Sequence, residues 1–221
     1  MSFKTKKYQV IRGALSKELA NFIFNYMMLQ RDAVDFMTKN NKVNPANPFM
    51  GTRTDQQVPG AYSKYADWVM ETLLQYMRPI MKAKTGLELI PTYSYTRLYE
   101  NGHILKRHKD RPSCEVSTTL HLGGEEWPIF LDPSGADFVI DEYKQTIKPG
   151  APKGIQVDLK VGDMLIYAGC ELEHWREPFE GENCAQVFMH YNNIEGPFGA
   201  KNKFDKRPLL GVPKTFIRYS K

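Results

Sequence analysis

Residues 93–121 of the chain read YSYTRLYENGHILKRHKDRPSCEVSTTLH, and this stretch decides the fold. β-Branched and aromatic residues alternate on both sides of the turn at Asn101-Gly102, which predicts a strand, a turn and a second strand. His108 and Asp110 lie two residues apart, and side chains two apart in an extended chain face the same way. This spacing allows one imidazole and one carboxylate to bind the same metal ion.

A third candidate ligand stands much later in the chain. Strand-like segments continue to residue 191, and His174 lies near their end. Two histidines and one carboxylate form a facial triad with open positions, which is the arrangement typical of non-haem Fe(II) oxygenases. A His-x-Asp triplet also arises by chance, so only its context gives it weight. With that context we predict that His108, Asp110 and His174 bind a metal ion.

A longer pattern surrounds these three residues. It consists of Tyr99, Gly102, His108, Asp110, Gly162, Asp163, Leu165, Tyr167, His174 and Pro178. This pattern resembles the Fe(II)- and 2-oxoglutarate-dependent dioxygenases of the prolyl 4-hydroxylase type, and the resemblance covers about residues 87 to 192. It implies an enzyme that hydroxylates an unactivated C–H with Fe(II), 2-oxoglutarate and O2, and that releases succinate and CO2.

The resemblance also implies a cation that binds 2-oxoglutarate. Its distal carboxylate is best bound by an arginine, which can make two parallel hydrogen bonds to it. Members of the family carry Arg or Lys nine to eleven residues after the distal histidine, where this sequence has Asn183, Cys184 and Ala185. The usual anchor is therefore missing from its usual place.

Four other residues are candidates for the co-substrate site. Arg176 is the predicted replacement anchor, because it follows His174 by two residues on a strand and so faces the same way. Arg97 and His121 are the alternatives. Tyr99 matches the tyrosine that the family places on the first core strand, and we expect it to contact the co-substrate or the substrate.

Two amphipathic helices are expected before the strands begin. Ser16 is suited to cap a helix over residues 17–38, and a second helix is expected over about 63–84, with a kink at Pro79. The loop between them, residues 40–60, is a candidate flap over the active site. Each helix has one apolar stripe that we expect to face the core: Leu19, Phe22, Ile23, Tyr26, Met27, Leu29 and Val34 in the first, and Tyr65, Trp68, Val69, Leu73, Tyr76 and Met77 in the second.

From residue 87 the hydrophobic period changes to two. Strands are expected near 87–99, 103–108, 115–122, 127–131, 155–159, 163–167, 171–177 and 184–191. This order predicts an α+β fold, a double-stranded β-helix (jelly roll) core of about eight antiparallel strands with the N-terminal helices packed on one face. We expect a single oxygenase domain over 1–221, with helical support over about 16–85, the core over about 87–192, and a C-terminal tail over 193–221 that wraps the domain or mediates self-association.

Composition places the chain among compact intracellular proteins. It has 221 residues, 42% of them hydrophobic, and no apolar run long enough to span a membrane. The first residues lack the apolar core of a signal peptide, and the three spaced cysteines Cys114, Cys170 and Cys184 fit a reducing compartment. We therefore expect a cytoplasmic monomer or homodimer with no membrane partner.

Basic residues exceed acidic ones, giving a net charge of +5. They are interspersed with acids, which disfavours a nucleic-acid partner. The exception is the cluster of Lys106, Arg107, Lys109 and Arg111 around the predicted metal site, which we expect to steer an acidic co-substrate or substrate.

The favoured function is a dioxygenase that hydroxylates a prolyl residue of a peptide or protein. The prolyl substrate rests on the resemblance alone, because one fold hosts many substrates. One alternative is an oxygenase that acts on a nucleic-acid base or a free amino acid. The other is a jelly-roll binding module without catalysis, which the missing cation at residues 183–185 supports.

Overall fold

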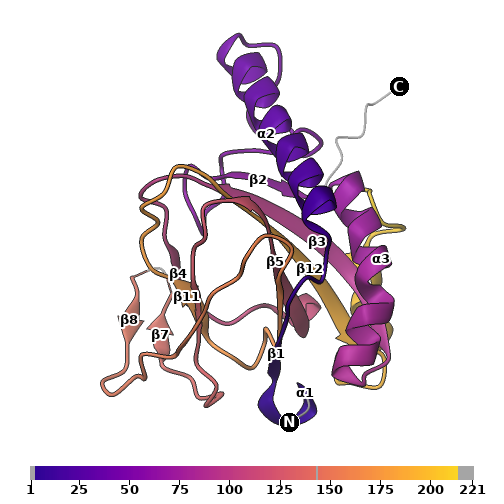
Figure 1. Cartoon of the computed structure of the whole chain (residues 1–221), viewed down its shortest axis with the longest axis vertical. Helices are drawn as coiled ribbons and strands as arrows, with labels where there is room; N and C mark the ends of the chain where they lie inside the picture. Colours follow the sequence, from indigo (N-terminus) through magenta and orange to yellow (C-terminus); the bar gives the residue numbers. More distant parts are fainter. Residues whose placement is uncertain (1–2, 143, 214–221) are drawn as a thin grey trace.

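The computed structural model describes residues 3–142 and 144–213, and its main feature is a pair of antiparallel sheets (Figure 1). The major sheet contains, in spatial order, β1 (Tyr8–Ile11), β10 (Met164–Tyr167), β5 (Val116–Gly124), β12 (Cys184–Asn193), β3 (Leu89–Tyr99) and β2 (Tyr62–Tyr65). The minor sheet contains β4 (Leu105–His108), β11 (His174–Arg176), β6 (Ile129–Leu131) and β9 (Ile155–Val157).

The eight strands β3–β6 and β9–β12 form the jelly roll. Each neighbouring pair in both sheets is antiparallel, and the long central strand β12 pairs with β3 on one side and β5 on the other. β1 and β2 extend the major sheet at its two edges. The region between residues 132 and 154 forms the small hairpin of β7 (Val139–Asp141) and β8 (Thr146–Ile147).

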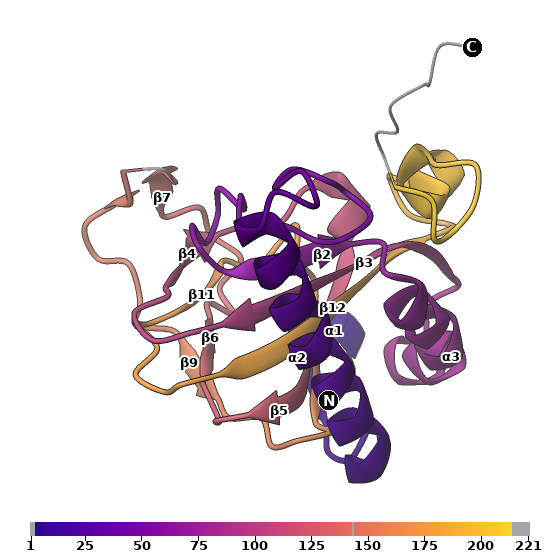
Figure 2. The ribbon, with the colours of Figure 1, turned by 90° about the horizontal axis from the view of Figure 1, so that it is seen from above.

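The helices cover the outer face of the major sheet. Seen from above, the minor sheet, the major sheet and the pair α2 (Lys17–Lys39) and α3 (Trp68–Thr85) form successive layers (Figure 2). Alternation along β5 explains this order, because Leu120 and Leu122 belong to the core under the helices whereas Ser117 and Thr119 point between the sheets. The remaining helical segments are α1 (Phe3–Lys6), η1 (Pro112–Cys114) and η2 (Gly199–Lys206).

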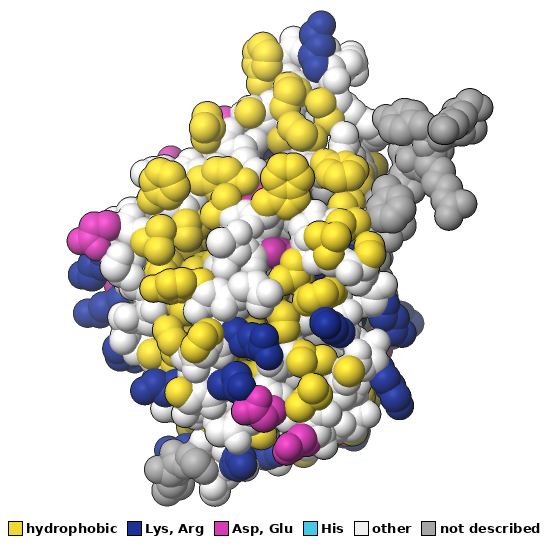
Figure 3. Space-filling view, turned by 90° about the vertical axis from the view of Figure 1, so that its right-hand side faces the viewer, with side chains coloured by type: hydrophobic (Ala, Val, Ile, Leu, Met, Phe, Trp, Pro, Cys, Tyr) yellow, Lys and Arg dark blue, Asp and Glu magenta, His cyan; other side chains and the backbone are white. Residues whose placement is uncertain are grey.

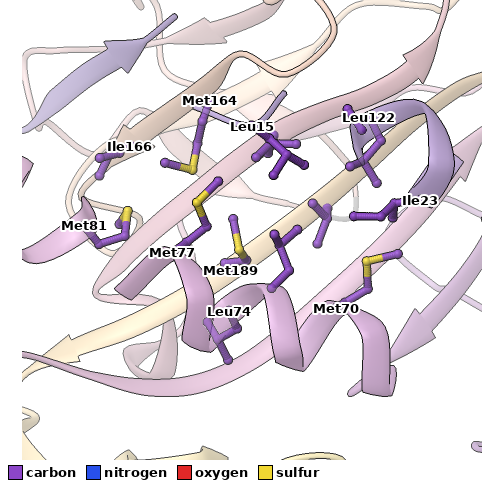
Figure 4. Packing of buried hydrophobic residues seen from close by; sticks show 14 of the residues in the cluster. Leu15, Ile23, Met70, Leu74, Met77, Met81, Leu122, Met164, Ile166 and Met189 are labelled. Atoms are coloured by element: carbon purple, nitrogen blue, oxygen red, sulfur yellow. The ribbon is translucent and has the colours of Figure 1, made fainter. Parts of the chain in front are cut away.

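Methionines fill much of the core between helices and sheet. Met70, Met77 and Met81 of α3 pack against Met164 of β10 and Met189 of β12 (Figure 4). Methionine is unbranched and flexible, so it fills irregular gaps where helices cross a twisted sheet. Burying each such side chain stabilises the fold by roughly 1.5–3 kcal/mol.

Helix α2 begins as expected but buries only part of its apolar surface. The Ser16 hydroxyl accepts a hydrogen bond from the Leu19 amide, which caps the first turn. Ile23, Met27 and Val34 are buried, whereas Phe22 and Leu29 are each 69% exposed. The prediction of a single apolar stripe that faces the core is therefore wrong, because the helix has one buried and one exposed apolar stripe.

Helix α3 starts later than the sequence suggested. Residues 62–65 form the edge strand β2, and Asp67 caps the helix by accepting bonds from the Val69 and Met70 amides. Two members of the expected stripe face water, since Trp68 is 72% exposed and Tyr76 is 64% exposed, whereas Leu73 and Met77 are buried. The helix continues through Pro79 to Thr85, close to the end expected at about residue 84.

The long loop and the tail both reach the sheets. Two residues of the 40–60 loop contact the chain near β2: the Met50 carbonyl accepts a hydrogen bond from the Tyr62 hydroxyl, and Thr52 pairs with Ser63 in an isolated β-bridge. After β12 the chain continues through η2 beside β3. Of the tail expected at 193–221, residues 214–221 lie outside the described residues. None of the helices in the described part of the chain has the length and apolar character needed to cross a bilayer.

Candidate metal centre

Two neighbouring strands and one turn bring the three predicted ligands together. His108 ends β4 and His174 begins β11, and the two residues face each other in the antiparallel register. Asp110 follows β4, where its amide donates to the Gly169 carbonyl over 2.9 Å. A Cβ at Gly169 would clash with the Asp110 carboxylate, so only glycine allows this approach.

The three ligand atoms converge on one point. Asp110 Oδ1 lies 3.7 Å from His108 Nε2 and 3.6 Å from His174 Nε2. His108 Nδ1 donates to the Lys106 carbonyl over 2.7 Å, and His174 Nδ1 donates to the Leu172 carbonyl over 3.0 Å. Each backbone carbonyl thus fixes the tautomer that leaves the Nε2 lone pair free for a metal.

The second oxygen of Asp110 is held by a polar chain. The Ser117 hydroxyl donates to Asp110 Oδ2 over 2.7 Å, and His190 Nδ1 lies 2.9 Å from the same hydroxyl. Because Ser117 uses its proton for the carboxylate, His190 is the donor in the second bond. One oxygen of Asp110 therefore faces the histidines while the other is fixed by β5 and β12.

The charge states suit a divalent cation. Burial, with the neighbouring His174, lowers the pKa of His108 to about 3, so the ring stays neutral near pH 7. Burial would raise the pKa of Asp110, but the charge and hydrogen bond of His174 outweigh it and hold that pKa well below its usual range. Two imidazoles and one carboxylate, with ligand atoms all within 4.8 Å of one another, fit an ion such as Fe(II).

A second overlapping set in the described residues, Asp110, Cys114 and His190, fits a metal less well. Burial and the charge of Asp110 raise the pKa of the Cys114 thiol well above its ordinary value. A metal ligand must be a thiolate, so a protonated Cys114 is unsuited to the role. Its Sγ instead lies 3.0 Å from the Tyr93 hydroxyl.

His108, Asp110 and His174 line one end of a cavity of about 290 Å³ between the sheets. Aromatic rings from β2, β3, β10 and β12 of the major sheet form much of its wall, and two side chains come from the 40–60 loop. The lining residues are Asp55, Gln57, Tyr65, Tyr93, Tyr95, Arg97, Leu105, His108, Asp110, Arg111, Ile129, Tyr167, His174, Phe188 and His190.

Arg97 lies in this cavity and is fully paired. Its guanidinium donates to Asp55 over 2.7 Å, to Gln57 over 2.9 Å and to the Tyr99 hydroxyl over 3.1 Å. The Asp55 carboxylate also accepts from the Tyr95 hydroxyl over 2.8 Å. The charge of Arg97 is thus balanced by the loop.

Arg176 is buried without an anion. Its side chain is 0% exposed, and its two terminal nitrogens donate to the Trp127 carbonyl and to the Thr119 hydroxyl. Its Nε has no hydrogen-bond partner among the described residues. Burial lowers the pKa of Arg176, as expected for a cation that no carboxylate compensates.

His121 lies in the same interior layer and offers a second free donor. The Gln186 amide nitrogen, which can only donate, lies 3.0 Å from His121 Nδ1, so the ring proton is on Nε2. That Nε2 also has no partner in the described part of the chain. The Gln186 carbonyl accepts from Thr119 over 2.9 Å, and Thr119 contacts Arg176. One network therefore orients two donors, Arg176 Nε and His121 Nε2.

Tyr99 separates these two groups of residues. Its side chain is 0% exposed, its hydroxyl accepts from Arg97, and its ring packs edge-on against Trp127 at 4.7 Å between centroids. Trp127 in turn gives its carbonyl to Arg176. All seven residues predicted from the sequence therefore lie between the sheets: the three ligands and Arg97 at the cavity, Tyr99, His121 and Arg176 deeper.

Several residues of the site were not found from the sequence. His190 and Ser117 hold Asp110 through the pairing of β5 with β12, and Asp55 and Gln57 come from the 40–60 loop. The alternation of β12 puts His190 on the same face as Gln186 and would have pointed to it. No local pattern marks Asp55.

The basic cluster at residues 106–111 is neutralised, contrary to the expectation that it steers acidic ligands. Arg107 is buried and pairs with Asp132 over 2.6 Å and with Glu173 over 2.7 Å. Lys109 pairs with Asp137, and Arg111 pairs with Asp205. These ion pairs stabilise the turns around the three candidate ligands. Because each cation is paired with an acid, its attraction for a distant acidic ligand is small.

Comparisons with known proteins address the fold. No protein-family model matches the sequence, and no curated protein matches it either. Solved structures do match. A prolyl-4-hydroxylase of Pseudomonas putida is 17% identical with a TM-score of 0.54, over 86% of this chain and 95% of that one.

Two further solved structures share the fold. HygX of Streptomyces hygroscopicus, solved with nickel, 2-oxoglutarate and hygromycin B, is 14% identical with a TM-score of 0.58, over 86% of this chain and 84% of that one. The non-heme α-ketoglutarate-dependent epimerase SnoN of nogalamycin biosynthesis is 14% identical with a TM-score of 0.60, over 98% and 93%. Identities this low establish a shared fold and no more. The fold expected from the sequence is confirmed.

Proposed function

We propose that this chain, which has the fold of the 2-oxoglutarate-dependent oxygenases, is an Fe(II)- and 2-oxoglutarate-dependent dioxygenase that hydroxylates an unactivated C–H. The observation that carries the proposal is the convergence of His108 Nε2, His174 Nε2 and Asp110 Oδ1, each fixed from behind by a hydrogen bond. Three protein ligands on one face leave the remaining positions for small molecules.

Iron held by His108, Asp110 and His174 would, together with 2-oxoglutarate and O2, supply the oxidising power, with succinate and CO2 as the products of the co-substrate. The chain supplies geometry. The Lys106 and Leu172 carbonyls hold the two imidazoles, and Ser117 restricts Asp110 to one oxygen toward the ion. The aromatic walls of the cavity exclude water from the reacting centre.

Arg176 and His121 are the proposed anchors of the distal carboxylate. Both are buried between the sheets, and each keeps one N–H donor without a partner among the described residues. A carboxylate that accepts from both would satisfy the two donors and neutralise the unpaired guanidinium. Arg97 is the weaker candidate because Asp55 already neutralises it. Tyr99 is proposed to contact the co-substrate from the opposite side.

The proposed substrate is a prolyl residue of a peptide or protein. Prolyl hydroxylases from Pseudomonas putida and from a Chlorella virus are among the structures that share the fold. The rings of Tyr65, Tyr95 and Phe188 give the cavity apolar walls that suit a pyrrolidine ring. A free amino acid needs an unpaired cation for its carboxylate, and Arg97 and Arg111 of the cavity both pair with aspartates.

The test is succinate formation by the Fe(II)-loaded protein after O2 is admitted, with and without proline-rich peptides. We expect peptides to stimulate turnover, and His108→Ala to abolish it together with metal binding. The matched control is His103→Ala, which changes a half-buried histidine on the turn before β4. It should keep both properties.

The same preparation separates the alternatives. If the protein binds 2-oxoglutarate but forms no succinate with any of the peptides tested, the true substrate is not among those peptides. Salt-sensitive binding of single-stranded DNA would favour the nucleic-acid alternative. Absence of both metal binding and 2-oxoglutarate binding would refute the oxygenase and leave a binding module.

A further inference from the structure

The exposed stripe of α2 consists of six residues that the enzyme site does not use. Leu19 is 40% exposed, Phe22 and Leu29 are each 69% exposed, and Phe36 is 67% exposed. Tyr26 and Ala33 continue the series between them, half-buried and exposed respectively. Hydrophobic side chains gather on the face that carries α2 and α3 (Figure 3). An apolar stripe of this length on a water-facing helix indicates an interaction site.

The spacing of this stripe is that of a coiled-coil seam. The positions 19, 22, 26, 29, 33 and 36 alternate steps of three and four, which is the a and d pattern of a heptad repeat. The contacts of α2 with its own core use mainly other positions, among them Ala20, Ile23, Met27 and Val34, although Tyr26 of the seam also packs against that core. The seam is therefore additional to what the fold requires of the helix.

We propose that the seam packs against the α2 seam of a second copy, antiparallel, in a twofold symmetric homodimer. A twofold axis makes one surface serve both partners, and an axis perpendicular to α2 reverses the direction of the second helix. With the axis between Tyr26 and Leu29, Leu19 faces Phe36 of the other copy and Phe22 faces Ala33. The large Phe22 thus meets the smallest residue of the stripe.

The charges beside the seam match this arrangement. Glu18, Asn25, Asp32 and Lys39 form the neighbouring heptad position on the water-facing flank of α2. In the antiparallel dimer Glu18 lies beside Lys39 of the other copy, twice by symmetry, and Asn25 lies beside Asp32. A parallel pair would place like residues together instead.

Apolar surface next to the seam enlarges the interface. Phe49 is 50% exposed and Trp68 is 72% exposed, and both line a cleft of about 280 Å³ that also includes Tyr26 of the seam. Two helices of this length pair only weakly in water when alone. The surrounding patch gives the dimer the additional area that a stable interface needs.

The first experiment is sedimentation velocity on the full chain. The wild type should sediment as a dimer of about 51 kDa, twice the 25.5 kDa of one chain, at about 10–100 μM. Phe22→Glu with Leu29→Glu should sediment at the monomer mass, with unchanged circular dichroism because both side chains are exposed. Ile140→Glu is the matched control, because Ile140 is 62% exposed on the distant β7. It should remain dimeric.

The second experiment tests direction. Glu18→Lys should weaken dimerisation about tenfold or more, by placing it beside Lys39 of the partner, and Glu18→Lys with Lys39→Glu should restore it. A single variant without effect would refute the antiparallel register. A monomeric wild type at about 100 μM, or a dimer that survives the double glutamate variant, would overturn the proposal. A dimer formed only after deletion of residues 214–221 would name the tail as the occupant and overturn it equally.

Discussion

Arg97 and Arg176 are two buried arginines with opposite electrostatic surroundings. Arg97 is paired with Asp55, and both side chains are under a tenth exposed. Among the described residues, Arg176 has neutral acceptors, the Trp127 carbonyl and the Thr119 hydroxyl. A buried charge without a counterion costs several kcal/mol of folding free energy. Such a cost is retained where the residue binds an anion.

This contrast gives the first prediction. Arg176→Met should weaken 2-oxoglutarate binding at least about 100-fold while leaving the free energy of unfolding nearly unchanged, since it removes an uncompensated charge. Isothermal titration of Mn(II)-loaded protein and thermal unfolding measure the two effects. Arg97→Met is the comparison, and it should lower stability by about 3 kcal/mol because it leaves Asp55 unpaired. Wild-type affinity in the Arg176 variant would transfer the anchor to another cation.

At the level of single residues, the sequence predicted which three side chains meet but not the residues that hold Asp110 in place. The triad follows from the spacing of His108 and Asp110 and from the position of His174 after a long run of strands. The roles of Ser117 and His190 depend on which residue of β12 faces which residue of β5, and a bulge between Ala185 and Gln186 shifts that register. A register shift of this kind has no local sequence signal.

Among the elements, the 40–60 loop is tied to the site at two places of different depth. Asp55 is buried against Arg97 and Tyr95 in the cavity. Arg53 pairs with Asp35 of α2 at the surface, with side chains 34% and 41% exposed. Buried pairs contribute more than exposed ones when one partner is removed. The inner contact is therefore the one that fixes the loop.

The second prediction follows from this difference. Asp55→Asn should speed amide hydrogen exchange in residues 51–60 by about tenfold or more, since it frees the loop from Arg97. Asp35→Asn should change the same amides less than about threefold. Exchange measured by mass spectrometry on the metal-free protein distinguishes them. Equal effects would mean that the loop is held by its backbone contacts and not by Asp55.

The sequence predicted approximately where the two long helices lie in the chain, but not which face of each helix is buried. Capping residues fix the start of α2 at Ser16, and Asp67 moves the start of α3 past β2. Hydrophobic periodicity cannot tell which of two stripes faces the protein's own sheet. Leu19, Phe22 and Leu29 look like core in the sequence but are exposed, because a partner surface and a core use the same residue types.

For the whole molecule, the buried neutral histidines make stability depend on pH. Burial, together with the charge of Arg176, lowers the pKa of His121 to about 4, against about 6.5 in the unfolded chain. Below pH 6.5 the unfolded chain therefore binds a proton that the folded chain does not. The stability linked to His121 is present above pH 6.5 and is lost as the pH falls toward 4.

The third prediction uses His121→Gln. Between pH 7 and pH 4.5 the free energy of unfolding of the metal-free variant should fall by about 2 kcal/mol less than that of the wild type. Urea denaturation at several pH values measures this difference. The carboxylates and the other histidines are the same in both proteins, so their contributions cancel in the difference. Parallel curves for the two proteins would show that His121 is protonated at the same pH in both states.

The order of strands in the major sheet has a consequence for synthesis on the ribosome. β12, the last strand of the described chain, occupies the centre of that sheet between β3 and β5. Until it emerges, both neighbours expose unpaired edges, and Asp110 lacks the second side of its support in His190. The support of Asp110 by His190 is therefore one of the final features that the nascent chain can complete, and a chain interrupted before residue 184 lacks it.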